Sequence, residues 1–349
     1  MTAGPWAGVR VVELSGLTGA YATRMWAALG AEVVVVEPPG GHVLRHMAPF
    51  APGHDGPEAS LWWAFFAQGK RSVVAEVGSD EYARVVSSAD VVIGDVDPAL
   101  GAPEPAHERQ VVVAISPFGL SGPRLGWKGS ELVAWASSGL AHTIGFPDRP
   151  PVAAATSVQF ASHVTSLFAF NAAMLGLRAV RRTGRGQVID LSMQECCLSC
   201  APETGVPLFL DDRVRRFRPG NRRAVTRPWG LYPCTDGFVS FLVIQPAHWK
   251  AMAAWIAEAT GIDAALDDVF NDMRVRWEVS DFIDDLTEQL TRPRTKLELF
   301  VEGQRRGIPI TPVNTVADLR SDPHLRSAGF WRDDEHAVLG TLPGPGAPF

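Results

Sequence analysis

Two short β-branched runs separated by a helix-length segment open the sequence. The runs are Val9 to Leu14 and Glu32 to Glu37, and apolar residues recur at helical spacing over Tyr21 to Leu29 between them. A glycine-containing turn, Gly16 to Gly19, follows the first run. Two strands joined by a helix pair in parallel, and parallel sheets are covered on both faces. This pattern therefore restricts the chain to an α/β fold.

Further strand candidates continue the same alternation. They are Ser72 to Val77, Val91 to Ile93 and Val111 to Ser116, and helix-sized segments such as Asp80 to Ser88 separate them. We therefore predict a mostly parallel sheet, doubly wound or close to it. The turn after the first strand reads SGLTGA and lacks the G-x-G-x-x-G spacing of a dinucleotide site, which counts against NAD as a ligand.

The second half of the chain changes character. A long apolar helix is expected at Ala161 to Arg182, followed by a strand at Gln187 to Leu191. The basic segment Arg213 to Arg227 contains turn-forming residues and no clear periodicity, so we predict a domain crossing there. A smaller α+β region follows, with a strand at Gly237 to Ile244 and an amphipathic helix near Trp249 to Ala259.

The composition limits the possible partners. The chain has 349 residues, 46% of them hydrophobic, and its 38 acidic and 32 basic residues give a formal net charge of -6. Because these charges are spread along the chain, no basic surface for nucleic acid or for a membrane is expected. Met1 to Val12 lacks the features of a secretory signal, and no apolar run approaches the ~20 residues of a membrane helix. We expect a cytoplasmic protein that binds a small molecule or another protein chain.

Three cysteines are crowded together, at Cys196, Cys197 and Cys200, and a fourth is Cys234. A zinc site is one interpretation of this cluster. Adjacent cysteines point to different faces of a helix, however, and no histidine lies nearby in sequence, so the ligand spacing is poor. Free buried thiols in a reducing compartment are the alternative, and we expect no metal.

Several stretches, in this order along nearly the whole chain, carry a resemblance to a known family. They are the opening GVRVVELS…ALGAEVVVVEPPGG, GKRSVVAEV at Gly69 to Val77, SPFGLSGPR at Ser116 to Arg124, RRTGRGQVIDLSM at Arg181 to Met193, YPCTDGFVSF at Tyr232 to Phe241, and RGIPITPVNTVADLRSDPHLRSAGFW at Arg306 to Trp331. Together they resemble the family III CoA-transferases, also called the CaiB/BaiF family. That group includes formyl-CoA transferase, carnitine CoA-transferase and the α-methylacyl-CoA racemases.

The resemblance implies an architecture. A large Rossmann-like domain with a parallel-rich sheet is made from both ends of the chain, and a smaller α+β domain lies between. The implied boundaries are 1–212 for the large CoA-binding domain, 213–315 for the linker and small domain, and 316–349 for a return segment that packs on the large domain. Two chains interlock, as a homodimer or as a heterodimer with a paralogous chain, near Arg213 to Arg227.

The resemblance also implies coenzyme A or an acyl-CoA as the substrate, with no metal. CoA would lie along Gly16, Leu17 and Thr18, and Lys70 and Arg71 would approach its phosphates, since charge-assisted hydrogen bonds suit such groups. The alternative is that the two cations are solvated charges at the start of a strand.

Two positions depart from the family in ways that weaken a phosphate site. A basic residue of the family is replaced by Val35, and an Asn-Phe-x-Pro-Gly segment is replaced by Asp95-Val96-Asp97-Pro98-Ala99. Acids at Asp95 and Asp97 would repel the phosphates of CoA.

The largest departure is at the family's nucleophile. The Asp-aromatic-x-x-Gly motif of the family falls on Gln159-Phe160-Ala161-Ser162-His163. In the family that aspartate attacks the acyl-CoA thioester, forms a mixed anhydride and then carries CoA as an aspartyl thioester. An amide is a far poorer nucleophile, so we expect no such reaction from Gln159. Ser130 and Gln245 are the nearest matches to the histidine and second acid of the racemases, and neither exchanges a proton near neutral pH.

Two other residues are candidates for the same cavity. His163 lies four positions after Gln159 and shares its face if both are helical, although a histidine among apolar neighbours is often a hydrogen-bonded core residue. Glu131 stands where relatives often have an acid, or caps a helix that begins near Leu132.

Three hypotheses follow from these departures. The first is an acyl-CoA-handling subunit completed by an Asp-bearing partner chain. The second is a diverged enzyme acting on a thioester or another ligand through His163, Glu131 or Ser130. The third is a binding or scaffold protein without catalysis.

Overall fold

The computed structural model describes residues 4–97, 104–152, 159–200, 218, 220–221 and 226–346. Its contacts divide the chain into two compact units. The first unit comprises Met1–Thr143, Val152–Arg216 and His324–Phe349, and the second comprises Ile144–Pro151 and Phe217–Pro323. Most of the expected domain crossing, Arg213 to Arg227, lies outside the described residues, so its role in an interlocked pair of chains stays a prediction.

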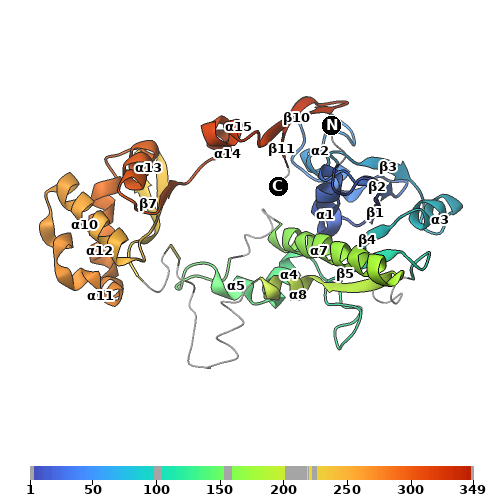
Figure 1. Cartoon of the computed structure of the whole chain (residues 1–349), viewed down its shortest axis with the longest axis horizontal. Helices are drawn as coiled ribbons and strands as arrows, with labels where there is room; N and C mark the ends of the chain where they lie inside the picture. Colours follow the sequence, from blue (N-terminus) through green and yellow to red (C-terminus); the bar gives the residue numbers. More distant parts are fainter. Residues whose placement is uncertain are drawn as a thin grey trace. The chain divides into compact units, whose positions relative to one another are not determined.

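A six-stranded parallel sheet forms the centre of the first unit (Figure 1). Its order is β3-β2-β1-β4-β5-β6, and every neighbouring pair is parallel. The strands are β1 (Arg10–Leu14), β2 (Glu32–Glu37), β3 (Arg71–Val74), β4 (Val91–Asp95), β5 (Val111–Ser116) and β6 (Gln187–Ser192). The α/β fold class predicted from the alternation of strand and helix patterns is therefore confirmed.

Both faces of this sheet are buried, which explains its uninterrupted β-branched sequences. One face packs Ile93 and Val113 against α1 (Leu17–Ala28) and α7 (Phe160–Thr183). The other face packs Val92 and Val112, which are adjacent to them in sequence, near α3 (Asp80–Ser87). Alternation of neighbouring side chains across the strand thus builds two cores from one run of residues.

Helix α7 is long and apolar enough to cross a membrane by length and composition alone. From the sequence, no apolar run of this length was expected. In the structure 56% of its most apolar stretch is buried against protein, as expected for a core helix. The fit on the sheet is close: a Cβ added at Gly176 would lie 2.5 Å from the Val111 side chain. Gly184, at a φ of 76°, ends the helix in the left-handed conformation that glycine favours.

The remaining elements of the first unit surround this core. They are η1 (Val43–His46), α2 (Leu61–Phe66), α4 (Glu131–Ser137), α5 (Leu140–Thr143), α8 (Met193–Ser199) and a C-terminal hairpin of β10 (Trp331–His336) and β11 (Gly340–Pro345). The short helix α15 (Pro323–Ser327) precedes the hairpin. Arg24 of α1 donates hydrogen bonds to the Gln68 side chain and to the carbonyl oxygen of Pro345, so the hairpin packs on the N-terminal βαβ unit.

The second unit is the smaller α+β region that the sequence predicts. Its antiparallel sheet has the order β7-β8-β9, formed by β7 (Trp229–Cys234), β8 (Gly237–Leu242) and β9 (Ile310–Pro312). Its helices are α10 (Pro246–Thr260), η3 (Asp263–Leu266), η4 (Asp268–Asn271), α11 (Met273–Glu278), α12 (Ser280–Thr291), α13 (Lys296–Arg305) and α14 (Val316–Ser321). Phe241, Trp249 and Ile283 belong to its separate apolar core.

Candidate functional site

The order of the parallel sheet determines where a ligand is expected. The chain runs outward from β1 through β2 to β3 and then returns to β4 on the other side of β1, which creates a topological switch point between β1 and β4. Ligands of open α/β sheets bind beyond the carboxyl ends of the strands at such a point. Here the turn Gly16 to Thr18 follows β1, and Asp95 ends β4. These sequence-predicted CoA positions therefore meet at one edge.

Asp95 contacts the turn directly. One carboxylate oxygen accepts a hydrogen bond from the Gly16 amide at 2.7 Å, and the other accepts one from the Thr18 hydroxyl. Desolvation by the surrounding protein raises the pKa of Asp95 and Glu13 adds to the shift, whereas the bonds from Thr18 and Gly16 lower it. Val96 donates its backbone amide to Ile115, which keeps the chain in sheet geometry just past β4.

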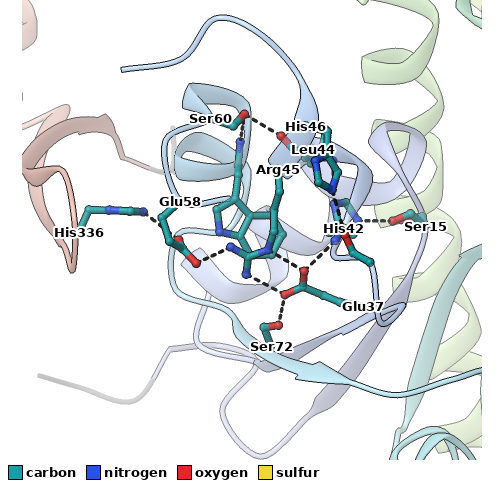
Figure 2. Close-up of polar contacts among 12 residues, drawn as sticks. Ser15, Glu37, His42, Leu44, Arg45, His46, Glu58, Ser60, Ser72 and His336 are labelled. Carbon is teal, nitrogen blue, oxygen red and sulfur yellow. Dashed lines mark hydrogen bonds and ion pairs between the residues drawn. The ribbon is translucent and has the colours of Figure 1, made fainter. Parts of the chain in front are cut away.

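His42 contacts Ser15, the residue just before this turn (Figure 2). Its Nδ1 lies 3.2 Å from the Leu44 amide, which can only donate, so Nδ1 accepts and the proton is on Nε2. Nε2 therefore donates to the carbonyl oxygen of Ser15 at 2.9 Å. His42 was not predicted as a site residue. A single histidine after two glycines forms no recognisable motif, and only the fold brings it within hydrogen-bonding distance of Ser15.

Glu37, at the end of β2, organises the residues around His42 (Figure 2). It accepts hydrogen bonds from the backbone amide of His42 at 2.8 Å, from the Arg45 guanidinium at 2.6 Å and 2.8 Å, and from the Ser72 hydroxyl. Burial acts to raise its pKa, but these donors outweigh burial and hold the pKa at about 2. Arg45 in turn stacks on Trp63, 3.7 Å from the ring centre. Through His42 the network reaches the backbone of Ser15, just before the turn.

Lys70 is not exposed toward a ligand. Its side chain is 2% exposed, and its Nζ lies 2.7 Å from the Glu13 carboxylate. It also donates to the Ala20 carbonyl oxygen and to the Thr23 hydroxyl. Desolvation lowers the pKa of Lys70, against the attraction of Glu13. In place of a phosphate ligand or a solvated charge, the structure shows a buried ion pair beneath α1. In the sequence, the sign of such a pair is Glu13, an acidic residue within the apolar strand β1.

Arg71 begins the outermost strand, β3, level with the middle of β1. Val34 pairs with Arg71 on one side and with Val12 on the other, and Gly16 is four residues beyond Val12. At ~3.3 Å per strand residue, the backbone of Arg71 is roughly 13 Å from the turn along the strands. Its exposed guanidinium pairs with Glu32 at 3.0 Å. The structure therefore does not bring Arg71 to the turn.

The start of α7 gathers the three candidate catalytic residues. Gln159 immediately precedes the helix with φ 48° and ψ 46°, in the left-handed region that residues other than glycine seldom adopt. Glu131 accepts hydrogen bonds from the backbone amides of Ala161 and Ser162 at 2.7 Å and 2.8 Å, and from the Ser162 hydroxyl. Glu131 thus caps α7. Glu131 also lies in the first turn of α4, the helix that the sequence places near Leu132.

His163 supports Gln159 from within the first turn of α7. Its Nδ1 lies 2.8 Å from the Gln159 carbonyl oxygen, so Nδ1 carries the proton, and Nε2 of the neutral ring carries the lone pair. The ring packs against Tyr21 and Phe66, with ring centres 5.5 Å and 5.8 Å away. One turn later, the Ser166 hydroxyl donates to the Thr18 carbonyl oxygen, which joins α7 to the turn after β1.

The two racemase-like positions have structural roles. Ser130 is the N-cap of α4, and its hydroxyl accepts a hydrogen bond from the Val133 amide. Gln245 precedes α10 in the second unit.

The cysteine cluster shows no chemistry of its own. Burial raises the pKa of both the Cys196 and Cys197 thiols to about 12, so neither is a thiolate near neutral pH. Among the residues that the structure describes, no group of histidine, cysteine and acidic side chains could hold a metal ion.

Two cavities in the described part of the chain belong to the second unit, and no predicted site residue lines either of them. The first has a volume of about 250 Å³ and is lined by Tyr232 and several acids, among them Asp284 and Glu288. Such a lining is unsuited to the phosphates of a nucleotide.

Comparisons with known proteins show which proteins the chain is similar to. The chain is 29% identical to the BbsE subunit of succinyl-CoA:(R)-benzylsuccinate CoA-transferase from Thauera aromatica, with 97% of this chain and 86% of that protein covered. It is 26% identical to the succinyl-CoA–L-malate CoA-transferase alpha subunit of Chloroflexus aurantiacus, over 97% of this chain and 81% of the relative. Such homologues act on acyl-CoA thioesters and transfer CoA between carboxylic acids.

A solved structure gives the same result for the fold. The crystal structure of a CAIB/BAIF family protein from Brucella suis superposes with a TM-score of 0.86 at 25% identity, covering 100% of this chain and 93% of that one. The sequence model of CoA-transferase family III matches residues 6–349. With nearly the whole chain matched, this protein belongs to CoA-transferase family III.

Proposed function

We propose that this chain is one subunit of a cytoplasmic CoA-transferase, and that a paralogous chain with an aspartate at the position of Gln159 supplies the nucleophile. The reaction moves CoA from an acyl-CoA thioester to a free carboxylic acid. One observation carries the proposal: Gln159 occupies a constrained position at the start of α7, yet its side chain is an amide.

The geometry around Gln159 supports this assignment of the position. A left-handed conformation costs a residue with a Cβ roughly 1–2 kcal/mol, so it persists only where the surroundings enforce it. Here the carbonyl oxygen of Gln159 accepts from both the amide and the ring of His163, and Glu131 caps the next two residues. Such constraint is typical of a reactive residue, which points to an active-site framework that has lost its nucleophile.

The chemistry explains why a partner is needed. In the covalent route, a carboxylate attacks the thioester carbonyl, the C–S bond breaks, and CoA leaves as a thiolate, so that a mixed anhydride remains. The thiolate then attacks the aspartyl carbonyl, releases the first carboxylic acid and forms an aspartyl thioester. Each step begins from an ionised acid or its ester, which Gln159 cannot provide.

The relatives support a multi-chain enzyme. Two of them are themselves named as subunits, BbsE and the malate CoA-transferase alpha subunit. An enzyme built from paralogous chains can retain one complete nucleophile while the second chain diverges at that position.

The test uses the purified chain with an acyl-CoA and a carboxylate acceptor. We expect no transfer by the unmodified chain and measurable exchange by Gln159→Asp, because that change restores an ionisable acid. Gln159→Asn is the matched control, since asparagine has the size of aspartate and also tolerates the left-handed conformation. Robust transfer by the unmodified chain that survives Gln159→Ala would show that another residue is the nucleophile.

A further inference from the structure

We propose that Asp95 is a built-in competitor for the phosphates of CoA, so that the turn Gly16 to Thr18 of this chain does not hold a nucleotide diphosphate tightly. This inference rests on the proposed function and deepens it. The turn keeps its shape, while the tight nucleotide site of the assembled enzyme is the one in the partner chain.

The first reason is that a carboxylate already lies at the start of α1. The N-terminus of a helix attracts an anion through its unpaired amides and its dipole. Helix α1 has no acidic residue in its own first turn, and its N-cap, Gly16, has no side chain. Asp95 reaches this end from β4 and accepts from the Gly16 amide and the Thr18 hydroxyl. Two donors of the turn, the Gly16 amide and the Thr18 hydroxyl, are therefore already bonded to a carboxylate of this chain.

The second reason is that the turn is fixed on both sides of this contact. His42 donates to the carbonyl oxygen of Ser15, just before Gly16, and Ser166 donates to the carbonyl oxygen of Thr18. Because the Ser15 carbonyl and the Gly16 amide belong to one peptide group, the bond from His42 holds that amide in its orientation toward Asp95. A phosphate must displace Asp95 or bind beside its charge.

The third reason is the distribution of nearby cations. Lys70 is paired with Glu13, and Arg71 lies on the outermost strand, β3, where it pairs with Glu32. Lys128 is exposed, but its Nζ lies 3.5 Å from Asp97. A phosphate that approaches the turn therefore meets a like charge, which at ~5 Å lowers affinity roughly fourfold in bulk water and more than a hundredfold at the effective dielectric of a protein surface.

The test compares CoA with pantetheine, which shares the thiol arm and lacks the phosphates, by calorimetric titration of the full chain. In the unmodified protein we expect the two affinities to agree within about tenfold, since the phosphates gain little. Asp95→Asn keeps the shape of the side chain and removes its charge. We expect it to raise the affinity for CoA by about tenfold or more and to leave pantetheine binding unchanged.

Two variants serve as controls. Thr18→Val loosens the contact but keeps the Asp95 charge, and it should not improve CoA binding. Asp90→Asn makes the same charge change beside the other end of β4, where Asp90 accepts from the Arg10 amide, and it should also have no effect. If Asp95→Asn fails to fold, the comparison of the two ligands in the unmodified chain still decides.

Two results would overturn the inference. One is an unmodified chain that binds CoA a hundredfold more tightly than pantetheine, and the other is a folded Asp95→Asn variant with unchanged CoA affinity. Neither result bears on the proposed function, which is judged separately by whether the chain supports transfer when it is combined with an Asp-bearing paralogue.

Discussion

Glu37 shows how one buried acid couples the end of β2 to the turn after β1. Its side chain is nearly inaccessible at 2% exposure, and its pKa is about 2 against an ordinary value of 4.5. A lowered carboxyl pKa adds stability above the unfolded-state pKa, and this stability is lost as the pH falls through the folded-state pKa. The stabilisation at stake is on the order of 3 kcal/mol.

We therefore expect Glu37→Gln to lower the free energy of unfolding by roughly that amount at pH 7. The difference from the unmodified protein should shrink between about pH 4.5 and pH 2, as measured by urea denaturation across this range. Glu104→Gln, at an exposed position, is the control and should change stability by less than about 0.5 kcal/mol. A Glu37→Gln difference that is independent of pH would contradict the account of the network.

Lys70 provides a second test at this scale. Lys70→Met removes one partner of a buried ion pair and leaves the Glu13 carboxylate uncompensated, so we expect a loss of about 3–5 kcal/mol in the free energy of unfolding. Combining it with Glu13→Gln should recover part of that loss, since no buried charge then remains unpaired. A single variant as stable as the parent would mean that Lys70 is free for a ligand after all.

Lys70 and Arg71 also show what sequence can and cannot establish. The sequence motif that contains them predicts a strand, and the strand is present. Where each side chain lies depends on the parallel register of β3 with β2 and on the space beneath α1. A sequence pattern shows neither of these. The turn after β1 was predictable because glycine and the strand boundary mark it. Its supports, His42 and Ser166, come from distant segments and carry no local signal.

At the scale of elements, the start of α7 depends on a cap from another helix. Glu131 satisfies two amides that the helix leaves unpaired, and Gln159 itself provides no side-chain cap. Long-range capping of this kind is invisible to the sequence rule that looks for a cap beside the helix it serves. The sequence indicated an acid at the start of the helix near Leu132, where Glu131 lies, but not its hydrogen bonds to α7.

We expect Glu131→Ala to destabilise the protein by about 1–2 kcal/mol, because a charged cap and its hydrogen bonds are lost. Thermal and urea unfolding measure this, and hydrogen exchange should show the first turn of α7 opening more often. Ser130→Ala, which removes the cap of the neighbouring α4, is the matched control and should leave exchange in α7 unchanged. Protected α7 amides in Glu131→Ala would show that the helix start is held by other contacts.

At the scale of the whole molecule, the order of strands and helices was predictable because each element carries its own periodicity. The first unit takes segments from both ends of the chain. The sequence did not predict that the short segment Ile144–Pro151 belongs to the second unit. It is stabilised by contacts far apart in sequence, such as the Arg218 side chain bonding to the carbonyl oxygens of Phe146 and Arg149.

Assembly is the prediction that belongs to this scale. We expect the chain to form a dimer with itself or with an Asp-bearing paralogue, and sedimentation at micromolar concentration should show two chains per particle. If the chain stays monomeric and does not bind the paralogue, the interlocked architecture is wrong. A partner chain then has no route by which to supply the nucleophile.

The central claim is that the reactive carboxylate belongs to a partner chain. The direct measurement is to combine both chains with an acyl-CoA, trap the intermediate with hydroxylamine or borohydride, and locate the modified residue by peptide mass spectrometry. The account predicts modification at the aspartate of the paralogous chain and none in this one. A trapped acyl or CoA adduct on a carboxylate of this chain, such as Glu131, would contradict it.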